Sequence, residues 1–76
     1  MHRFLIIIEQ GPHNYSAYAP DLLGCIATGK TLEEVKSNMS EAIRFHLQGM
    51  LEDHEAIPAA QSLAEYVDVP LPDSAA

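Results

Sequence analysis

The sequence predicts a small α+β domain, in which a three-stranded antiparallel meander is followed by one long helix and a parallel fourth strand (β-β-β-α-β). Three observations lead to this prediction. An unalternating apolar run stands near the N-terminus, two short strand-like segments with tight turns follow, and a long stretch of apolar residues at helical spacing comes next. A chain of 76 residues has room for one domain, which we expect at residues 1–70, with a flexible tail at 71–76.

The apolar run Phe4–Ile8 is the predicted first strand. It carries no polar residue on either face, which is typical of a strand covered on both sides, so we expect it in the middle of the sheet. The segment Gln10–Asn14 contains Gly and Pro, which favour a chain reversal. The first and second strands should therefore form a hairpin.

The second and third strands are predicted at Tyr15–Ala19 and Cys25–Thr28. The segment Pro20–Gly24 between them has turn composition, and Gly29-Lys30 forms the next turn. Because both connections are short, the three strands should pair in sequence order as an antiparallel meander.

A long amphipathic helix is predicted from Thr31 onwards. Thr31 and Glu34 have the spacing of a capping box, in which each side chain accepts a hydrogen bond from a free backbone N–H at the helix start. Apolar residues then recur at steps of three and four. The helix should end near residues 53–55, because Pro58 cannot continue it.

The fourth strand is predicted at Glu65–Val69, where apolar and polar residues alternate until Pro70 and Pro72 stop the strand. A right-handed crossover through the helix would place it parallel to the first strand, on that strand's free edge. The expected sheet order is 3-2-1-4. One helix covers only one face of such a sheet, so part of the first strand should stay exposed and form an oligomer interface, giving a homodimer or homotetramer. This interface would draw on Phe4, Leu5, Ile6, Ile7 and Ile8.

The composition is acidic, with four Lys and Arg against eleven Asp and Glu and a formal charge of −7. Nucleic-acid binding needs basic patches, so we expect no direct nucleic-acid partner. The charge favours a basic protein partner, while plain solubility explains it equally well. The apolar run is too short for a secretory signal or a membrane span, and a single Cys fits a reducing compartment. We therefore expect a cytoplasmic protein without membrane contact.

No set of residues predicts an enzyme, and we expect no catalytic residue, cofactor or metal. Glu9, Asp21, Glu33 and Glu34 are acids at turns and element ends, and Asp21 is expected to cap its own turn. Cys25 is expected to be a buried, unreactive thiol. Tyr15 and Tyr18 should lie on opposite faces of their strand, one under the helix and one exposed as an interface anchor or packed against neighbouring strands.

The stretch from Tyr15 to Val35 resembles the signature of HicB-type antitoxins. In that family an aromatic strand leads into Pro-Asp-Leu-x-Gly-Cys and then into Gly-x-Thr-x-Glu-Glu before a long helix, and the resemblance covers residues 3–69. The matching positions in this chain are Tyr15, Tyr18, Pro20, Asp21, Gly24, Cys25, Gly29, Thr31 and Glu34. A motif of this length is far more specific than an isolated short pattern.

The resemblance implies a partly degraded ribonuclease-H-like fold and a protein that binds and blocks a HicA-like toxin, a small basic ribonuclease that cleaves messenger RNA. Many family members add a C-terminal DNA-binding domain. Only seven residues follow Val69 here, so we expect a short form without that domain. The alternative is a solitary HicB-like oligomeric adaptor without a toxin partner, and an enzyme with vestigial hydrolase chemistry is the weakest interpretation.

Overall fold

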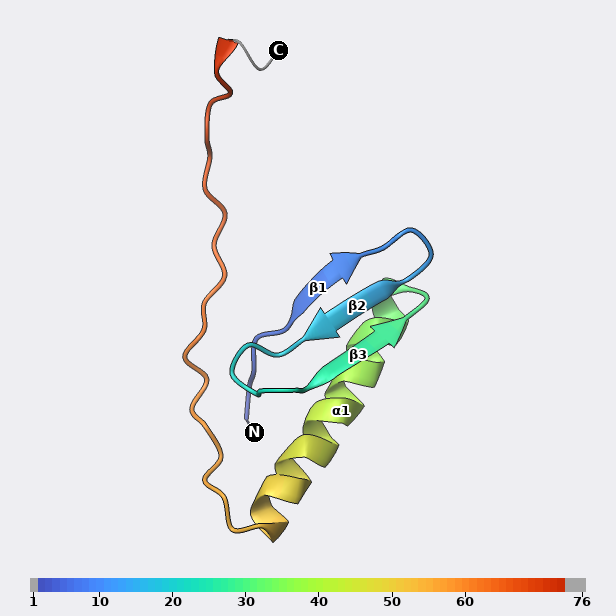
Figure 1. Cartoon of the computed structure of the whole chain (residues 1–76), viewed down its shortest axis with the longest axis vertical. Helices are drawn as coiled ribbons and strands as arrows, with labels where there is room; N and C mark the ends of the chain where they lie inside the picture. The colour runs from blue at the N-terminus through green and yellow to red at the C-terminus, as the bar shows by residue number, and fades with distance from the viewer. Residues whose placement is uncertain (1, 74–76) are drawn as a thin grey trace.

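The computed structural model describes residues 2–73 and contains three strands and one helix in the order β-β-β-α. Figure 1 shows the sheet as one layer and the helix as a second layer behind it. This arrangement confirms the predicted α+β class with an antiparallel meander and one long helix. The elements are β1 (Ile7–Gln10), β2 (Tyr15–Tyr18), β3 (Ile26–Gly29) and α1 (Leu32–Glu52).

The sheet is antiparallel throughout and has the order β1-β2-β3, so β2 is the central strand. The prediction that the first strand lies in the middle was wrong, because β1 is at the edge of this sheet. Its apolar residues divide between the two faces. Phe4, Ile6 and Ile8 pack against the core, while the alternate residue Ile7 pairs with Tyr18 on the opposite face. An unalternating apolar run therefore indicates that both faces meet apolar surroundings, not that both edges are paired.

The helix begins and ends at well-defined caps. Thr31 is the N-cap, and its Oγ1 accepts a hydrogen bond from the Glu34 backbone N–H at 3.0 Å. The Glu34 carboxylate accepts from the backbone N–H of Lys30, one residue before the cap. At the other end, His54 has a φ of 58° and donates to the Leu51 carbonyl, while Glu55 donates to the Met50 carbonyl. These two bonds form a Schellman motif, which satisfies carbonyl groups that the last helical turn leaves free.

The core is small and lies between α1 and the sheet. Val35 and Met39 of the helix are completely buried against small side chains of β2 and of the turn that follows it. Small residues there let the helix approach the sheet closely. The helix packs over β2 and β3 and does not extend over β1. The buried residues are Ala17, Ala19, Leu22, Cys25, Val35 and Met39.

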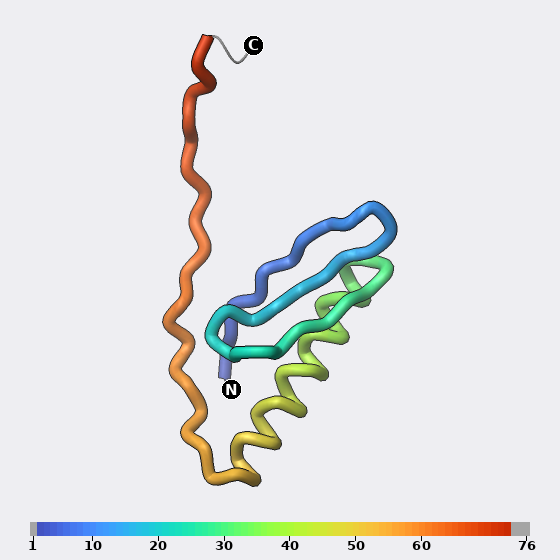
Figure 2. The backbone as a smooth tube through the Cα atoms, viewed as in Figure 1, coloured from blue at the N-terminus to red at the C-terminus, as the bar shows by residue number. Residues whose placement is uncertain are grey.

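The chain after the helix forms an extended segment, residues 55–73, which we call the arm; residues 2–54 are the body. Figure 2 shows the arm running past the sheet and away from it. The radius of gyration is 16.0 Å, against about 11 Å expected for a compact chain of this length. The arm therefore gives the molecule a long projection.

The arm contains no strand within the described residues, so the parallel fourth strand at Glu65–Val69 and the sheet order 3-2-1-4 are not found in this single chain. Residues 3–5 line a common pocket with Ala60, Ser62, Leu63 and Ala64, but beyond it β1 turns away from the arm (Figure 1). Without a neighbouring strand, Glu65–Val69 has no ladder to join. Residues 71–73 are exposed, and the rest of the predicted tail, 74–76, lies outside the described residues. The ribonuclease-H-like relation stays a prediction.

Candidate functional site

The turn between β2 and β3 holds most of the family-like motif. The Leu22 N–H donates to the Ala19 carbonyl, and the Cys25 N–H donates to the Leu22 carbonyl. Gly24 has a φ of +80°, a conformation that a residue with a Cβ adopts only at a cost. The turn buries Leu22 and Cys25 under the sheet and leaves Pro20 exposed. The motif thus builds a rigid corner of the body.

Asp21 joins this corner to the arm. Its Oδ2 accepts hydrogen bonds from the backbone N–H groups of Gln61 and Ser62, both at 3.1 Å, and its Oδ1 accepts from Ser62 Oγ at 2.8 Å. The prediction that Asp21 caps its own turn was therefore wrong. The bonds from the Ser62 backbone and hydroxyl, with a smaller contribution from Gln61, lower the pKa of Asp21 below its ordinary 3.8. Asp21 is an anchor that fixes where the arm leaves the body.

The second half of the motif fixes the start of the helix. A Cβ on Gly29 would lie 2.5 Å from the Val35 backbone nitrogen and 2.8 Å from its Cα. Only glycine allows β3 and the first turn of α1 to approach this closely. Together with the Thr31 and Glu34 cap, Gly29 sets the angle between helix and sheet. We conclude that these motif positions define shape.

The two tyrosines of the motif lie on opposite faces of β2. Tyr15 packs against the core on the helix side, and Tyr18 is exposed on the other side. Tyr18 stands in register between Ile7 of β1 and Ile26 of β3. These three residues form an apolar row on the face of the sheet turned away from α1.

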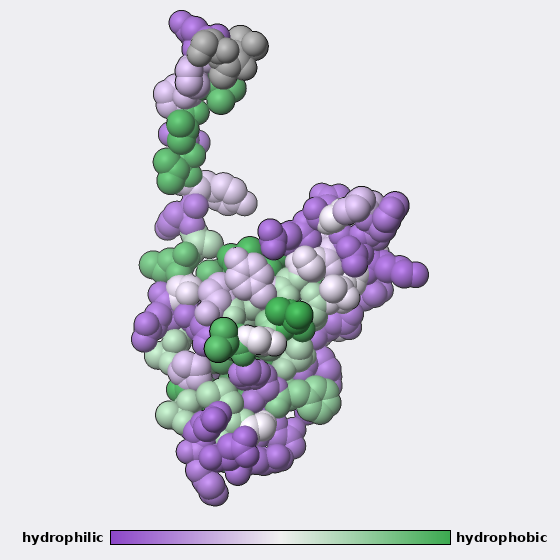
Figure 3. Space-filling model, in the orientation of Figure 1, coloured by the Kyte–Doolittle hydropathy of each residue, from purple (hydrophilic) through white to green (hydrophobic). Residues whose placement is uncertain are grey.

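We call this row and its surroundings the outer face. Ile26 is 70% exposed, and Leu23 in the adjoining turn is 96% exposed. Figure 3 shows hydrophobic residues in the middle of this face, with hydrophilic residues around them. A second row, Glu9, Ser16 and Thr28, lies beside the first. An apolar centre with a polar surround is typical of a protein-binding surface.

The predicted oligomer interface Phe4–Ile8 is divided by the structure. Phe4, Ile6 and Ile8 pack against the core from the helix side, and Ile7 belongs to the outer face. Leu5, half-buried, lines a pocket with Ala60, Ser62, Leu63 and Ala64 of the arm. The five residues therefore contribute to three different surfaces rather than to one.

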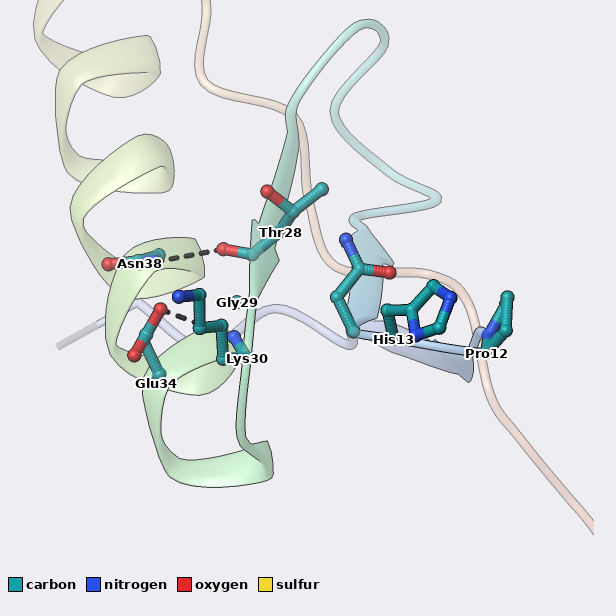
Figure 4. A pocket seen from close by; sticks show the side chains of 8 residues that line it. Pro12, His13, Thr28, Gly29, Lys30, Glu34 and Asn38 are labelled. Carbon is teal, nitrogen blue, oxygen red and sulfur yellow. Dashed lines mark hydrogen bonds between the residues drawn. The ribbon is translucent and has the colours of Figure 1, made fainter.

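A shallow depression of about 610 Å³ lies between the β1–β2 turn and the start of α1. Figure 4 shows Asn38 pointing to the carbonyl of Thr28, to which its Nδ2 donates at 2.8 Å, and Glu34 pointing to Lys30. These polar groups are engaged with each other, so the depression offers few free donors or acceptors. Its remaining wall comes from Pro12, His13 and Asn14.

The residues considered for chemistry are not brought together. Within residues 2–73, no three His, Cys, Asp or Glu side chains are grouped so as to hold a metal ion. Cys25 is buried and free of a disulfide, and burial raises the pKa of its thiol. A raised pKa leaves the thiol protonated and a poor nucleophile. In the described part of the chain, no helix is long and apolar enough to cross a membrane.

The sequence analysis did not predict that Gln61 and Ser62 donate hydrogen bonds to Asp21. These residues lie about 40 positions from Asp21, and neither belongs to a local motif. The only signal was that Asp21 stands in a turn with no helix to cap. Asn38, which ties α1 to β3, also has no distinguishing local pattern.

Comparison with known proteins gives a match over almost the whole described chain. A family model described as HicB-like antitoxin of bacterial toxin–antitoxin systems matches residues 4–73. An uncharacterised 14.9 kDa protein from the rep–hol intergenic region of Haemophilus phage HP1 is 42% identical over 65 residues, which are 86% of this chain and 49% of that protein. The chain thus spans about half the length of this relative.

Two shorter relatives bear only a family label. A UPF0150 protein of Helicobacter pylori is 43% identical over 49 residues, covering 64% of this chain and 67% of that one. A UPF0150 protein of Thermoplasma acidophilum is 35% identical over 54 residues, covering 71% and 78%. No solved structure matches the chain.

Proposed function

Because the chain belongs to the HicB-like antitoxins of bacterial toxin–antitoxin systems, we propose that it binds and neutralises a small basic HicA-like ribonuclease and does not itself cut RNA. The observation that carries this proposal is the family match across residues 4–73. The match includes the corner, the helix cap and the arm. The proposal places the chain in the cytoplasm, where such a toxin would meet messenger RNA.

The charge of the chain supports a basic partner. Seven more acids than Lys and Arg residues give a net charge of −7. Exposed Glu52, Asp53 and Glu55 gather at the C-terminal end of α1, where the last turn carries no basic residue. The helix dipole adds negative potential at the same end. A basic toxin would therefore be attracted over a distance, and its association should slow as salt rises from about 50 to 500 mM.

The outer face supplies the contact surface in this proposal. It presents Tyr18 and Ile26 on the sheet and Leu23 on the adjoining turn, and buried aromatic and apolar residues act as anchors in protein interfaces. The family-like motif residues do not touch the toxin directly, except for Tyr18. They hold the sheet, the helix and the arm in the geometry that presents the surface.

The test is coexpression with the product of any adjacent small basic gene. We expect this chain to rescue growth and to copurify with that product. Ile26→Asp on the outer face should abolish copurification, while Phe45→Asp should retain it. Phe45 is a suitable control because it is an apolar residue 59% exposed on α1. If a toxic product is neither rescued nor captured by the unaltered chain, the antitoxin proposal fails.

The alternative function is a solitary adaptor domain that oligomerises and binds another protein. The exposed outer face favours this alternative as much as it favours a toxin, since the face does not identify its partner. Absence of any neighbouring basic reading frame, together with retained oligomerisation, would select it.

A further inference from the structure

The first element of this inference is the free edge of β1. One side of β1 pairs with β2, and the other side pairs with no strand among the described residues. Backbone N–H and C=O groups along such an edge are a template for another strand. Natural edges are usually blocked by charge, proline or a bulge, whereas Phe4–Ile8 has neither charge nor proline and Glu9 is the one charge in β1. This edge is open to β-augmentation.

The second element is a groove beside the same edge. Because α1 packs over β2 and β3 and not over β1, a groove of about 340 Å³ remains between the N-terminal segment and the helix. Phe4, Ile6, Met39 and Ile43 supply its apolar lining, and Arg3 and Lys36 also line it. Arg3 and Lys36 are two of the four Lys and Arg residues in the chain. The groove is thus apolar with a basic rim.

The third element is the arm, which has matching properties. The odd-numbered residues would share one face of an extended strand, which is apolar at Leu63, Val67, Val69 and Leu71 and charged at Glu65. These four apolar residues and Tyr66 are between 72% and 103% exposed. Beyond Ser62, no hydrogen bond is found in the described part of the arm. The arm carries Glu65 and Asp68 and no Lys or Arg, so its charge is opposite to that of the groove rim.

The anchor at Asp21 decides which edge the arm reaches. With Gln61 and Ser62 fixed beside the corner, the arm leaves its own body in a direction that diverges from its own β1 (Figures 1 and 2). Leu63 and Ala64 still line a pocket with the chain's own residues 3–5, but beyond them the arm leaves its own β1 edge while the anchor holds. The β1 edge of a second copy is free of this restriction, and a two-fold axis would make the exchange reciprocal.

We propose that residues 63–69 of each copy add as a fourth strand to the β1 edge of a second copy, with the apolar side chains of the arm covering that copy's groove. Residues 63–69 and 4–10 are segments of equal length, each about 23 Å long when extended. Pro70 has no N–H to donate and ends the added strand. Because each copy gives its arm and receives the arm of the other, the exchange closes at two copies.

The first experiment measures mass with the full chain and no toxin. Light scattering at about 50 µM should give twice the 8.3 kDa of one copy. The double substitution V67D/V69D should give a single copy that retains the far-UV circular dichroism signal of α1. The matched control A56D/A59D adds the same two charges to exposed arm positions before the anchor and should keep the double mass.

A monomeric natural chain, or a V67D/V69D variant that keeps the double mass, would overturn the proposal. So would a chain that is monomeric alone and whose arm becomes protected only on the toxin. Because the readout is mass without toxin, failure of toxin neutralisation leaves this test unaffected.

The second experiment shows whether the arm is exchanged or folds back. In a Cys25→Ala background, a tagged chain with Val67→Cys is mixed with untagged chains carrying Ile6→Cys, Ile7→Cys or Ile8→Cys in turn. Exchange predicts a disulfide-linked pair of unlike chains for at least one of the three. When Val67→Cys and the best β1 cysteine are placed in one chain, exchange predicts linked dimers. A disulfide within single chains only would overturn the proposal.

Discussion

The body and the arm contain the same types of apolar residue, but these residues are buried in the core of the body and exposed in the arm. Val35 in the body is 0% exposed, whereas Val67 in the arm is 80% exposed; Leu22 is 2% exposed and Leu63 is 89% exposed. The body buries Val35 and Leu22 between two layers, because α1 lies across the sheet. The arm has no second layer in the single chain. Apolar alternation thus predicts which face of a strand will be buried. The strand itself forms only where the edge of another strand is available for pairing.

The largest expected difference between the two regions concerns truncation of apolar side chains. Met39→Ala empties a completely buried position and should lower the free energy of unfolding by about 3 kcal/mol. Leu63→Ala removes an exposed arm residue and should change it by less than about 0.5 kcal/mol at concentrations where the chain is monomeric. Urea unfolding followed by circular dichroism measures both. Similar losses for the two variants would mean that the arm packs on the body.

The next prediction tests whether the stability of the body depends on the close approach of α1 to β3 at Gly29. Gly29→Ala places a Cβ within 3 Å of the Val35 backbone and should destabilise the body by about 2 kcal/mol. Gly49→Ala is the matched control, since a Cβ there meets nothing within 4 Å. A helical Gly to Ala change should stabilise by about 1 kcal/mol. Thermal unfolding of both variants should therefore shift in opposite directions.

A smaller effect is expected at the junction of the two regions. His54 holds a left-handed conformation with a φ of 58°, in which glycine avoids the Cβ clash. His54→Gly should raise the free energy of unfolding by about 1 kcal/mol. Glu52→Gly, two residues earlier at the last position of the helix, should lower it by a similar amount. If both glycines destabilise, the Schellman end does not persist in solution.

The smallest effect on global stability is expected from the anchor. Asp21→Ala removes the acceptor of three hydrogen bonds and should speed hydrogen exchange at the Gln61 and Ser62 amides. The exchange of amides in β2 should be unchanged. Asn38→Ala, which removes a hydrogen bond to β3 instead, is the control and should leave the two arm amides as they are.

The anchor should also depend on pH in a defined direction. Hydrogen bonds from Ser62 and Gln61 lower the pKa of Asp21 below 3.8. The stabilisation is therefore complete above the ordinary pKa and is lost as the pH falls through the lowered value. The Ser62 amide should lose protection only in this acidic range. Loss of protection near neutral pH would point to a different anchor.

Much of the body could be predicted from local signals. The Pro20–Gly24 turn, the Thr31 and Glu34 cap and the helix end depend on residues a few positions apart, so their chemistry is readable in the sequence. The short connections fixed the order of the meander. The Asp21 anchor could not be read, because its donors are 40 and 41 positions away and nothing local marks them as partners.

The position of β1 shows a second limit. The Phe4–Ile8 run was interpreted as a central strand because both of its faces are apolar. The structure places it at an edge, with Ile8 towards the core and Ile7 on the outer face. The burial of a strand's faces and the pairing of its edges are separate properties, and the hydrophobic pattern predicts only the burial of the faces. Edge pairing depends on where distant segments lie, which the pattern does not contain.

The exposed arm has a consequence for the lifetime of the protein. A protease needs several residues of extended, unbonded backbone in its cleft, and residues 63–71 already offer this without any unfolding of the body. Cleavage would then follow the fraction of chains whose arm is uncovered. A copy whose arm is bound would be degraded more slowly than a free copy. The rate of degradation would therefore depend on the fraction of copies that have bound a partner.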